Sequence, residues 1–348
     1  MPNVGSGFEF FNVGASSTNI FIDVTDNVLA GNGDFGAAFF GGSAPGSNSG
    51  AVFHGNKIGT NGTSLFPSLN AGVLFSDAAN IQVGGTTAGF RNLISGNAGP
   101  GIEFVGTGSK QVVEGNFIGT TAAGTSALPN HLDGVLIEGA ATGNTIGGSP
   151  TGARDLLSGN ADDGIAIQGP GTTANNVSGD VIGLNAAGTA RLPNGNAGGS
   201  VSAGASANVF QRNVFAGNAG DGLDLFGSAT DGNVLEGNFF GLSAGQVIPN
   251  GGDGVFLGAG ATENTIGGTT AGAGNTITGS SFDALHLHLF PDRFSAARHG
   301  PRRDRDRDRE LQHVAVLELQ DEPLKSKRLR APNDKKLQKR CTSLRSTW

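Results

Sequence analysis

The sequence predicts an all-β fold, a right-handed single-stranded parallel β-helix of about nine turns, and three observations carry this prediction. Short apolar segments alternate with a period of two, as in Val135–Ile137, which is typical of strands. Gly and Asn bound each segment and permit sharp corners. The whole pattern recurs roughly every thirty residues, so each copy is one turn of a solenoid that shares its core with its neighbours.

Each copy of the repeat opens on a glycine, and short copies alternate with long ones. A short copy carries a segment of the NTIGG type, as at Asn144–Gly148, and a long copy carries a loop such as Ala122–Asn130. A proline recurs in that loop, and it belongs outside the strands because it has no backbone donor. The opening glycines are Gly7, Gly36, Gly72, Gly101, Gly134, Gly164, Gly199, Gly222 and Gly254.

The alternation also predicts which side chains point into the solenoid. In the segment after Gly164, Ile165 and Ile167 are expected to be buried and Gln168 to be exposed. The corresponding pairs in other copies are Ile102 and Phe104, Val135 and Ile137, Leu223 and Leu225, and Val255 and Leu257.

Asparagine recurs at two corners of the repeat. Because Asn tolerates left-handed backbone angles and its amide can hydrogen-bond from turn to turn, we expect these residues to form structural ladders. One set is Asn32, Asn97, Asn160 and Asn218, and the other is Asn56, Asn116 and Asn238.

The segments NTIGG, NLISGN (Asn92–Asn97), DGVLIEG and NFIG (Asn116–Gly119) resemble the parallel β-helix repeats of secreted bacterial proteins with the pectin-lyase-like fold. This resemblance extends from Gly7 to about Ser281. It implies the fold but no single activity, because the fold includes lyases, hydrolases, epimerases and non-catalytic surface proteins.

Charge and composition divide the chain near residue 282. Residues 1–281 hold 6 Lys and Arg against 19 Asp and Glu, a net charge of −13, and this disfavours nucleic acids and acidic polysaccharides as partners. The single cysteine, Cys341, lies outside this region, and no apolar run reaches transmembrane length. No signal peptide is visible, and the first repeat begins at once, so we expect a fragment of a secreted or cell-surface protein.

Asp162 and Asp163 are the candidates for catalysis, since paired carboxylates can act as acid and base in glycoside hydrolysis. The pair resembles the Asp-Asp segment of polygalacturonase-type hydrolases, but the Asn-Thr-Asp, Gly-His-Gly and Arg-Ile-Lys segments of that family are missing. Asp163 also belongs to the DG pair that opens many copies. His131 lies close to Asp133 in the sequence and could act as a general base, but its loop position favours a solvated side chain.

The aspartates of the DG pairs are Asp133, Asp163, Asp221 and Asp253. Asp133 and Asp163 open adjacent turns, and so do Asp221 and Asp253. Stacked carboxylates repel one another, so either they lie in water or they share a calcium ion, which prefers carboxylate and carbonyl oxygens. Calcium is the one cofactor that the sequence suggests.

From Phe282 onwards the repeat is no longer evident, and we predict that residues 1–281 form the β-helix and residues 282–348 a disordered basic tail. One permitted encoding of Arg305–Leu319, read one base later, gives ATATASSNTSQFSNC, which resembles the closing strands of a β-sandwich. We therefore hypothesise a frameshift near residue 282.

The leading functional prediction is a non-catalytic surface protein for adhesion or carbohydrate contact. The alternative is a polysaccharide lyase or glycoside hydrolase. Expected partners are a polysaccharide or cell-surface glycan and, through open solenoid ends, further copies of the chain; no nucleic acid and no membrane span are expected.

Overall fold

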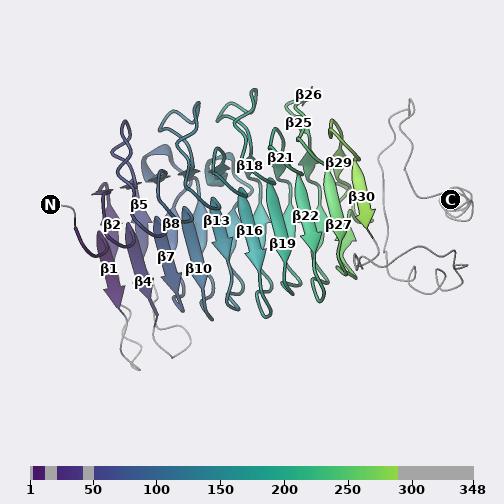
Figure 1. Cartoon of the computed structure of the whole chain (residues 1–348). Helices are drawn as coiled ribbons and strands as arrows, with labels where there is room; N and C mark the ends of the chain where they lie inside the picture. Colours follow the sequence, from purple (N-terminus) through teal and green to yellow (C-terminus); the bar gives the residue numbers. More distant parts are fainter. Residues whose placement is uncertain (1–2, 12–21, 42–50, 289–348) are drawn as a thin grey trace, which may run out of the picture.

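The computed structural model describes residues 3–11, 22–41 and 51–288. These residues form a right-handed parallel β-helix, a straight rod whose turns follow one another in sequence order (Figure 1). Three long parallel sheets run along the rod, and each turn contributes one strand to each sheet. The predicted fold class is confirmed.

Sheet 1 contains ten strands, and Figure 1 shows them side by side along the rod. They are β1 (Phe8–Phe11), β4 (Ala37–Phe40), β7 (Val73–Ser76), β10 (Ile102–Val105), β13 (Val135–Ile137), β16 (Ile165–Gln168), β19 (Gly199–Ser202), β22 (Leu223–Phe226), β27 (Val255–Gly258) and β30 (Leu285–His288).

Sheet 2 contains nine strands. They are β2 (Asp23–Thr25), β5 (Val52–His54), β8 (Gln82–Gly84), β11 (Val112–Glu114), β14 (Thr145–Gly147), β17 (Asn176–Ser178), β20 (Val209–Gln211), β23 (Val234–Glu236) and β28 (Thr265–Ile266).

Sheet 3 also contains nine strands, which are short. They are β3 (Val28–Leu29), β6 (Lys57–Ile58), β9 (Leu93–Ile94), β12 (Phe117–Ile118), β15 (Leu156–Leu157), β18 (Val181–Ile182), β21 (Val214–Phe215), β24 (Phe239–Phe240) and β29 (Thr276–Ile277).

The remaining elements are small. Strands β25 (Leu242–Ser243) and β26 (Gln246–Val247) form an antiparallel pair, and η1 (Ala88–Phe90) and η2 (Thr151–Ala153) are single turns of 3₁₀-helix. Among the described residues, no helix is long and apolar enough to cross a membrane.

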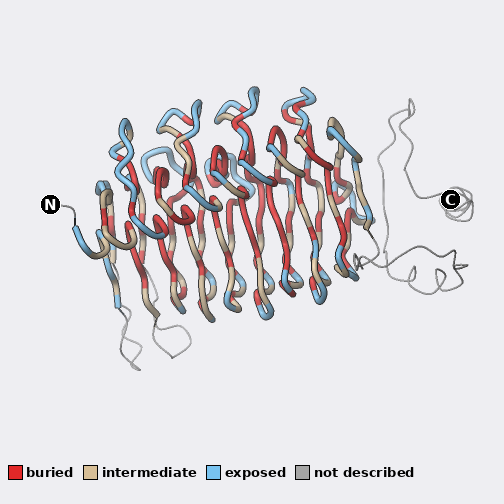
Figure 2. Tube along the Cα trace, viewed as in Figure 1, coloured by how far each residue is buried: buried red, intermediate tan, exposed pale blue. Residues whose placement is uncertain are grey.

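The predicted inward side chains form the core. Ile165 and Ile167 are completely buried, as are their counterparts in the other copies, apart from Phe104 and Leu257, which are almost so (Figure 2). Gln168 is half-buried rather than exposed, because its amide donates to Glu138 Oε2 at 2.7 Å on the neighbouring turn.

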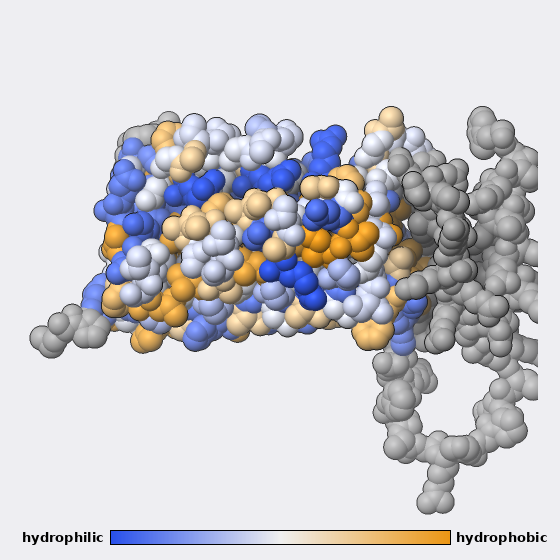
Figure 3. Space-filling model, turned by 90° about the horizontal axis from the view of Figure 1, so that it is seen from above, coloured by the Kyte–Doolittle hydropathy of each residue, from blue (hydrophilic) through white to orange (hydrophobic). Residues whose placement is uncertain are grey.

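A second, smaller apolar cluster lies on the outer face of sheet 3, where loops of the long copies fold over the strands. Its buried members are Leu93, Phe117, Leu156, Val181, Leu184, Ala216 and Ile248. Figure 3, seen from above, shows apolar and polar side chains interspersed on this side, with apolar colour extensive towards the C-terminal part of the rod.

The structure corrects two details of the repeat. The glycine that opens the copy before β19 is Gly198, not Gly199, because the Ile165 amide donates to the Gly198 carbonyl and Gly199 pairs with Ile165. The solenoid also does not end at residue 281, because β30 pairs in parallel with β27 and Leu285 lies opposite Val255.

The predicted break at Phe282 was therefore placed too early. Asp283 takes the place of the recurring aspartate, and Ala284 takes the place of the opening glycine, which hid this copy in the sequence. Residues 289–348 lie outside the described residues, so the predicted tail and frameshift stay predictions.

The core assignment gives a first test. Replacing Ile167 with Asp places an unpaired carboxylate in a site without solvent, and we expect a loss of more than about 4 kcal/mol of stability. Urea unfolding followed by circular dichroism measures this loss. Replacing Glu263, which is exposed, with Gln is the control and should leave the transition unchanged; a soluble Ile167→Asp variant with an unchanged midpoint contradicts the assignment.

Candidate functional site

The aspartates that precede the opening glycines stack along the upper edge of sheet 1, and their carboxylates bind backbone. Asp133 Oδ1 accepts the Asp163 N–H at 3.1 Å, and Asp163 Oδ1 accepts the Ala197 N–H at 2.9 Å. Further along, Asp253 and Asp283 donate their N–H groups to Asp221 Oδ1 at 2.5 Å and Asp253 Oδ1 at 2.7 Å. The recurring aspartate is thus a structural acceptor that links successive turns.

The predicted catalytic pair, Asp162 and Asp163, lies beside Asp133. One oxygen from each of the three carboxylates falls within 4.8 Å of the others. Burial raises the pKa of Asp133 to about 7, and repulsion by Asp163 and Asp162 adds to this shift. Burial also raises the pKa of Asp163, while hydrogen bonds from Ser200 and Ala197 lower it.

This geometry gives little support to catalysis at Asp162 and Asp163. The carboxyl groups of retaining glycosidases lie about 5–5.5 Å apart, and those of inverting enzymes about 6.5–9.5 Å apart. Asp163 is buried, and its carboxylate already accepts a backbone N–H. His131 is exposed, as its loop position suggested.

Asp224 is the acidic residue that sequence reasoning missed. It is the central outward residue of β22, between Leu223 and Leu225, and its Oδ1 is buried without a hydrogen-bond partner. Burial raises the pKa of Asp224 to about 9; a hydrogen bond with the Asp221 carboxyl and repulsion by Asp221, Asp163 and Asp253 add to this. This shift favours the protonated form of Asp224 over its carboxylate.

A second cluster lies at the next turns of sheet 1. His286 Nδ1 lies 2.7 Å from Asp253 Oδ2, and Asp283 joins them within 4.8 Å. Asp253 is buried, whereas His286 is half-buried. This cluster was hidden in the sequence because it includes residues beyond the expected end of the solenoid.

The four aspartates predicted to hold calcium do not form one continuous site. Ala197 interrupts the column between Asp163 and Asp221, so the structure brings together Asp133 with Asp162 and Asp163, and Asp253 with Asp283 and His286. The first group offers only carboxylate oxygens, as calcium prefers, and the second includes an imidazole, which suits zinc and other transition metals better. Calcium binding stays a prediction.

Aromatic side chains adjoin the second cluster on the outer face of sheet 1. The central residues of β19, β22, β27 and β30 are in register: Ser200 lies opposite Asp224, Asp224 opposite Phe256, and Phe256 opposite His286. The rings of Phe256 and His286 meet edge to face at 5.2 Å, and Phe226, at the end of β22, is 39% exposed. We call Ser200, Asp224, Phe226, Phe256 and His286 the aromatic–acidic patch.

A glycine makes room for the central ring of this patch. A Cβ atom at Gly258 would lie 2.6 Å from the tip of the Phe256 ring. The ring therefore leans over the backbone of its own strand, and a larger residue at position 258 would displace it.

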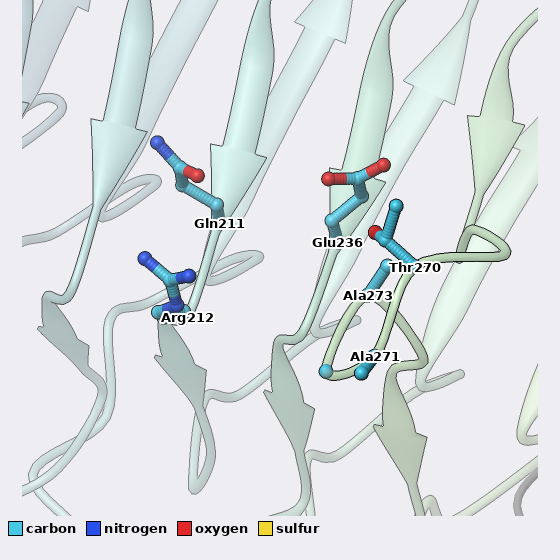
Figure 4. A pocket seen from close by; sticks show the side chains of 7 residues that line it. Gln211, Arg212, Glu236, Thr270, Ala271 and Ala273 are labelled. Carbon is cyan, nitrogen blue, oxygen red and sulfur yellow. The ribbon is translucent and has the colours of Figure 1, made fainter.

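Figure 4 shows a pocket on a different face, lined by Gln211, Arg212, Glu236 and the segment 270–273. Its volume is about 50 Å³, far below the roughly 300–1,000 Å³ of typical small-molecule sites. It has room for water or a single small group.

No protein-family model matches the chain, and no curated protein matches it by sequence. Among solved structures, it is similar to a periplasmic alginate epimerase (12% identity, TM-score 0.44) and to the Dettilon tailspike protein (15%, 0.35). The chain is 78% covered in both comparisons and spans 62% and 61% of those chains. The Azotobacter vinelandii mannuronan C-5 epimerase A-module matches at 12% identity and a TM-score of 0.30, with 79% of this chain and 91% of that chain covered.

The second cluster gives a test of the aspartate column. Replacing Asp253 with Ala leaves the Asp283 N–H without its acceptor and removes the partner of His286, so we expect a loss of about 1–3 kcal/mol. Hydrogen exchange should show that β30 is less protected in the variant than in the parent protein, whereas the protection of β13 stays unchanged. Equal protection of β30 in the variant and the parent protein would contradict the proposed link.

Proposed function

We propose that this protein is a non-catalytic carbohydrate-binding β-helix, secreted or displayed on a cell surface, that contacts glycans through the aromatic–acidic patch. The observation that carries this proposal is the in-register row of Ser200, Asp224, Phe256 and His286 across four adjacent strands. Ser200 is buried, whereas Asp224, Phe256 and His286 are half-buried, so these three residues offer an ordered surface to an extended ligand.

The chemistry of the patch suits a sugar chain. Sugar rings present C–H groups on their faces and hydroxyl groups at their edges. The rings of Phe226 and Phe256 can lie against the faces, while the imidazole group of His286 can hydrogen-bond to the hydroxyl groups. The net charge of −13 over residues 1–281 favours neutral or amino-sugar polymers over acidic ones.

The shape of the rod supports a polymer rather than a small molecule. Among the described residues, the small pocket of Figure 4 lies away from the patch and is too small for a sugar ring to be enclosed. Rungs of a β-sheet repeat every 4.7–4.9 Å or so, which gives a regular set of contacts along the rod axis.

Binding to a panel of neutral, amino-sugar and acidic polysaccharides tests this proposal. Replacing Phe256 with Ala should weaken binding to the preferred polymer at least about tenfold, because the ring at the centre of the row, between Asp224 and His286, is lost. Leu69→Ala, which removes a side chain that is 64% exposed elsewhere on the rod, is the matched control and should bind normally. Absence of binding to every polymer, or an equal loss in both variants, contradicts the proposal.

Glycoside hydrolysis is the second candidate, and one observation favours it. Burial raises the pKa of Asp224 to about 9, and a carboxyl group with a raised pKa could act as the general acid. Reducing-end detection separates the two functions: we expect no cleavage by the parent protein, and none by the Asp162→Asn, Asp163→Asn double variant. Cleavage that Asp224→Asn abolishes would establish the enzyme instead.

A further inference from the structure

The corner between sheets 2 and 3 contains a ladder of buried amides that changes character halfway along the rod. Aspartates replace asparagines at two successive rungs, as the segment DLLSGN at Asp155–Asn160 shows beside NLISGN at Asn92–Asn97. Asp155 and Asp180 are both 0% exposed. The rungs in order are Asn27, Asn56, Asn92, Asn116, Asp155, Asp180, Asn213, Asn238 and Asn275.

An asparagine rung both accepts and donates. Asn213, for example, donates from Nδ2 to Asn238 Oδ1 at 3.1 Å and to the Val177 carbonyl at 2.9 Å. Its Oδ1 accepts the N–H of the rung before it at 3.0 Å. The ladder therefore requires a donor at the Nδ2 position of each rung.

As a carboxylate, Asp155 has no donor at the Nδ2 position, but its two oxygens accept three hydrogen bonds. Its Oδ1 accepts the backbone N–H and the Nδ2 of Asn116 at 2.6 and 3.0 Å, and its Oδ2 accepts the Gly147 N–H at 3.1 Å. Burial raises the pKa of Asp155 to about 7, while these hydrogen bonds favour its charged form.

Asp180 lacks such support. Its Oδ1 accepts the Asp155 N–H at 2.8 Å, and its Oδ2, which takes the position of Nδ2 in the other rungs, is buried and has no partner. The next rung presents Asn213 Oδ1, another acceptor. In an asparagine rung Nδ2 donates to the Oδ1 of the next rung, so by analogy Asp180 Oδ2 and Asn213 Oδ1 are two facing acceptors unless a proton lies between them.

The charged groups around the pair do not remove this conflict. Burial raises the pKa of Asp180 well above its usual value, the Asp155 carboxylate adds to the shift, and Arg154 opposes it. The charge of Glu114, like burial, raises the pKa of Asp155. Arg212 precedes Asn213 on the next turn and lines the small pocket of Figure 4.

We propose that the Asp155–Asp180 pair is a buried proton-binding site, in which Asp180 Oδ2 carries a proton and donates a hydrogen bond to Asn213 Oδ1. The proton replaces the amide hydrogen that an asparagine would supply. Its release as the pH rises breaks this link and weakens the central turns of the rod.

The stability of the protein depends on pH because the folded and unfolded states hold this proton with different pKa values. The unfolded chain loses this proton near the ordinary Asp value of 3.8, whereas the folded protein keeps it to a higher pH. The folded state thus binds more protons, so stability falls as the pH rises from about 4 through the folded-state pKa, and the unfolding constant rises by up to about tenfold per pH unit.

Replacing Asp180 with Asn tests the site directly, because it restores the ordinary rung. We expect the variant to be more stable than the parent at pH 8. The number of protons released on unfolding between pH 5 and 8 should also be smaller by about one in the variant. Urea unfolding across this range measures both quantities. Glu263→Gln, which removes an exposed carboxylate, is the control and should keep the parent slope.

The converse change supplies an independent test. Asn238→Asp places a carboxyl at a rung whose neighbours are both asparagines, so it should add a pH-dependent loss of stability that the parent lacks. If this variant folds at pH 5 but not at pH 8, the proposal is supported. An unchanged slope in Asp180→Asn, or a loss in Asn238→Asp that is equal at both pH values, overturns it.

Discussion

The three corners of each turn impose the constraint on which the whole rod depends. A corner takes the backbone out of the strand ladder, so buried N–H and C=O groups there need other partners. Asparagine supplies an acceptor and two donors on one short side chain. Buried amides stack along the corner between sheets 2 and 3, along the corner between sheets 3 and 1 (Asn97, Asn130, Asn160, Asn194, Asn218) and along the corner between sheets 1 and 2 (Asn144, Asn175, Asn208, Asn233).

Because of this constraint, chemically varied side chains occur mainly on the outer surface. Inward positions are apolar, and most corner positions must both donate and accept. The aspartates at the edge of sheet 1 solve a simpler problem, since a carboxylate only has to accept the N–H of the next turn. Their stacking brings carboxyl groups together, and the raised pKa values of Asp133 and Asp224 follow first from burial and then from this crowding. The residues that connect the turns thus also border the proposed binding surface.

The sequence predicted the features that depend on period and repetition alone. Ile165 and Ile167 point inward because alternate residues of a strand lie on the same face. The recurring asparagines predicted two of the ladders. The third ladder was missed because Asn144 was assigned to the NTIGG segment. Asp224 was missed because its raised pKa depends first on burial, and then on Asp221 of its own turn and on Asp163 and Asp253 of other turns. The turn at Ala284 was missed because alanine replaced the glycine used as the marker.

In a solenoid, each turn contacts only its neighbours, so local stability is set rung by rung. The aspartate rungs lie in the middle of the rod, and Asp180 directly precedes β18 (Val181–Ile182), one strand before β19. The turns that carry Ser200, Asp224, Phe256 and His286 therefore stack on the rung with the weakest polar link. A rung that opens there separates the aromatic–acidic patch from the N-terminal half of the core, whereas an asparagine at position 180 would hold the two halves together at any pH at which the rest of the rod is folded.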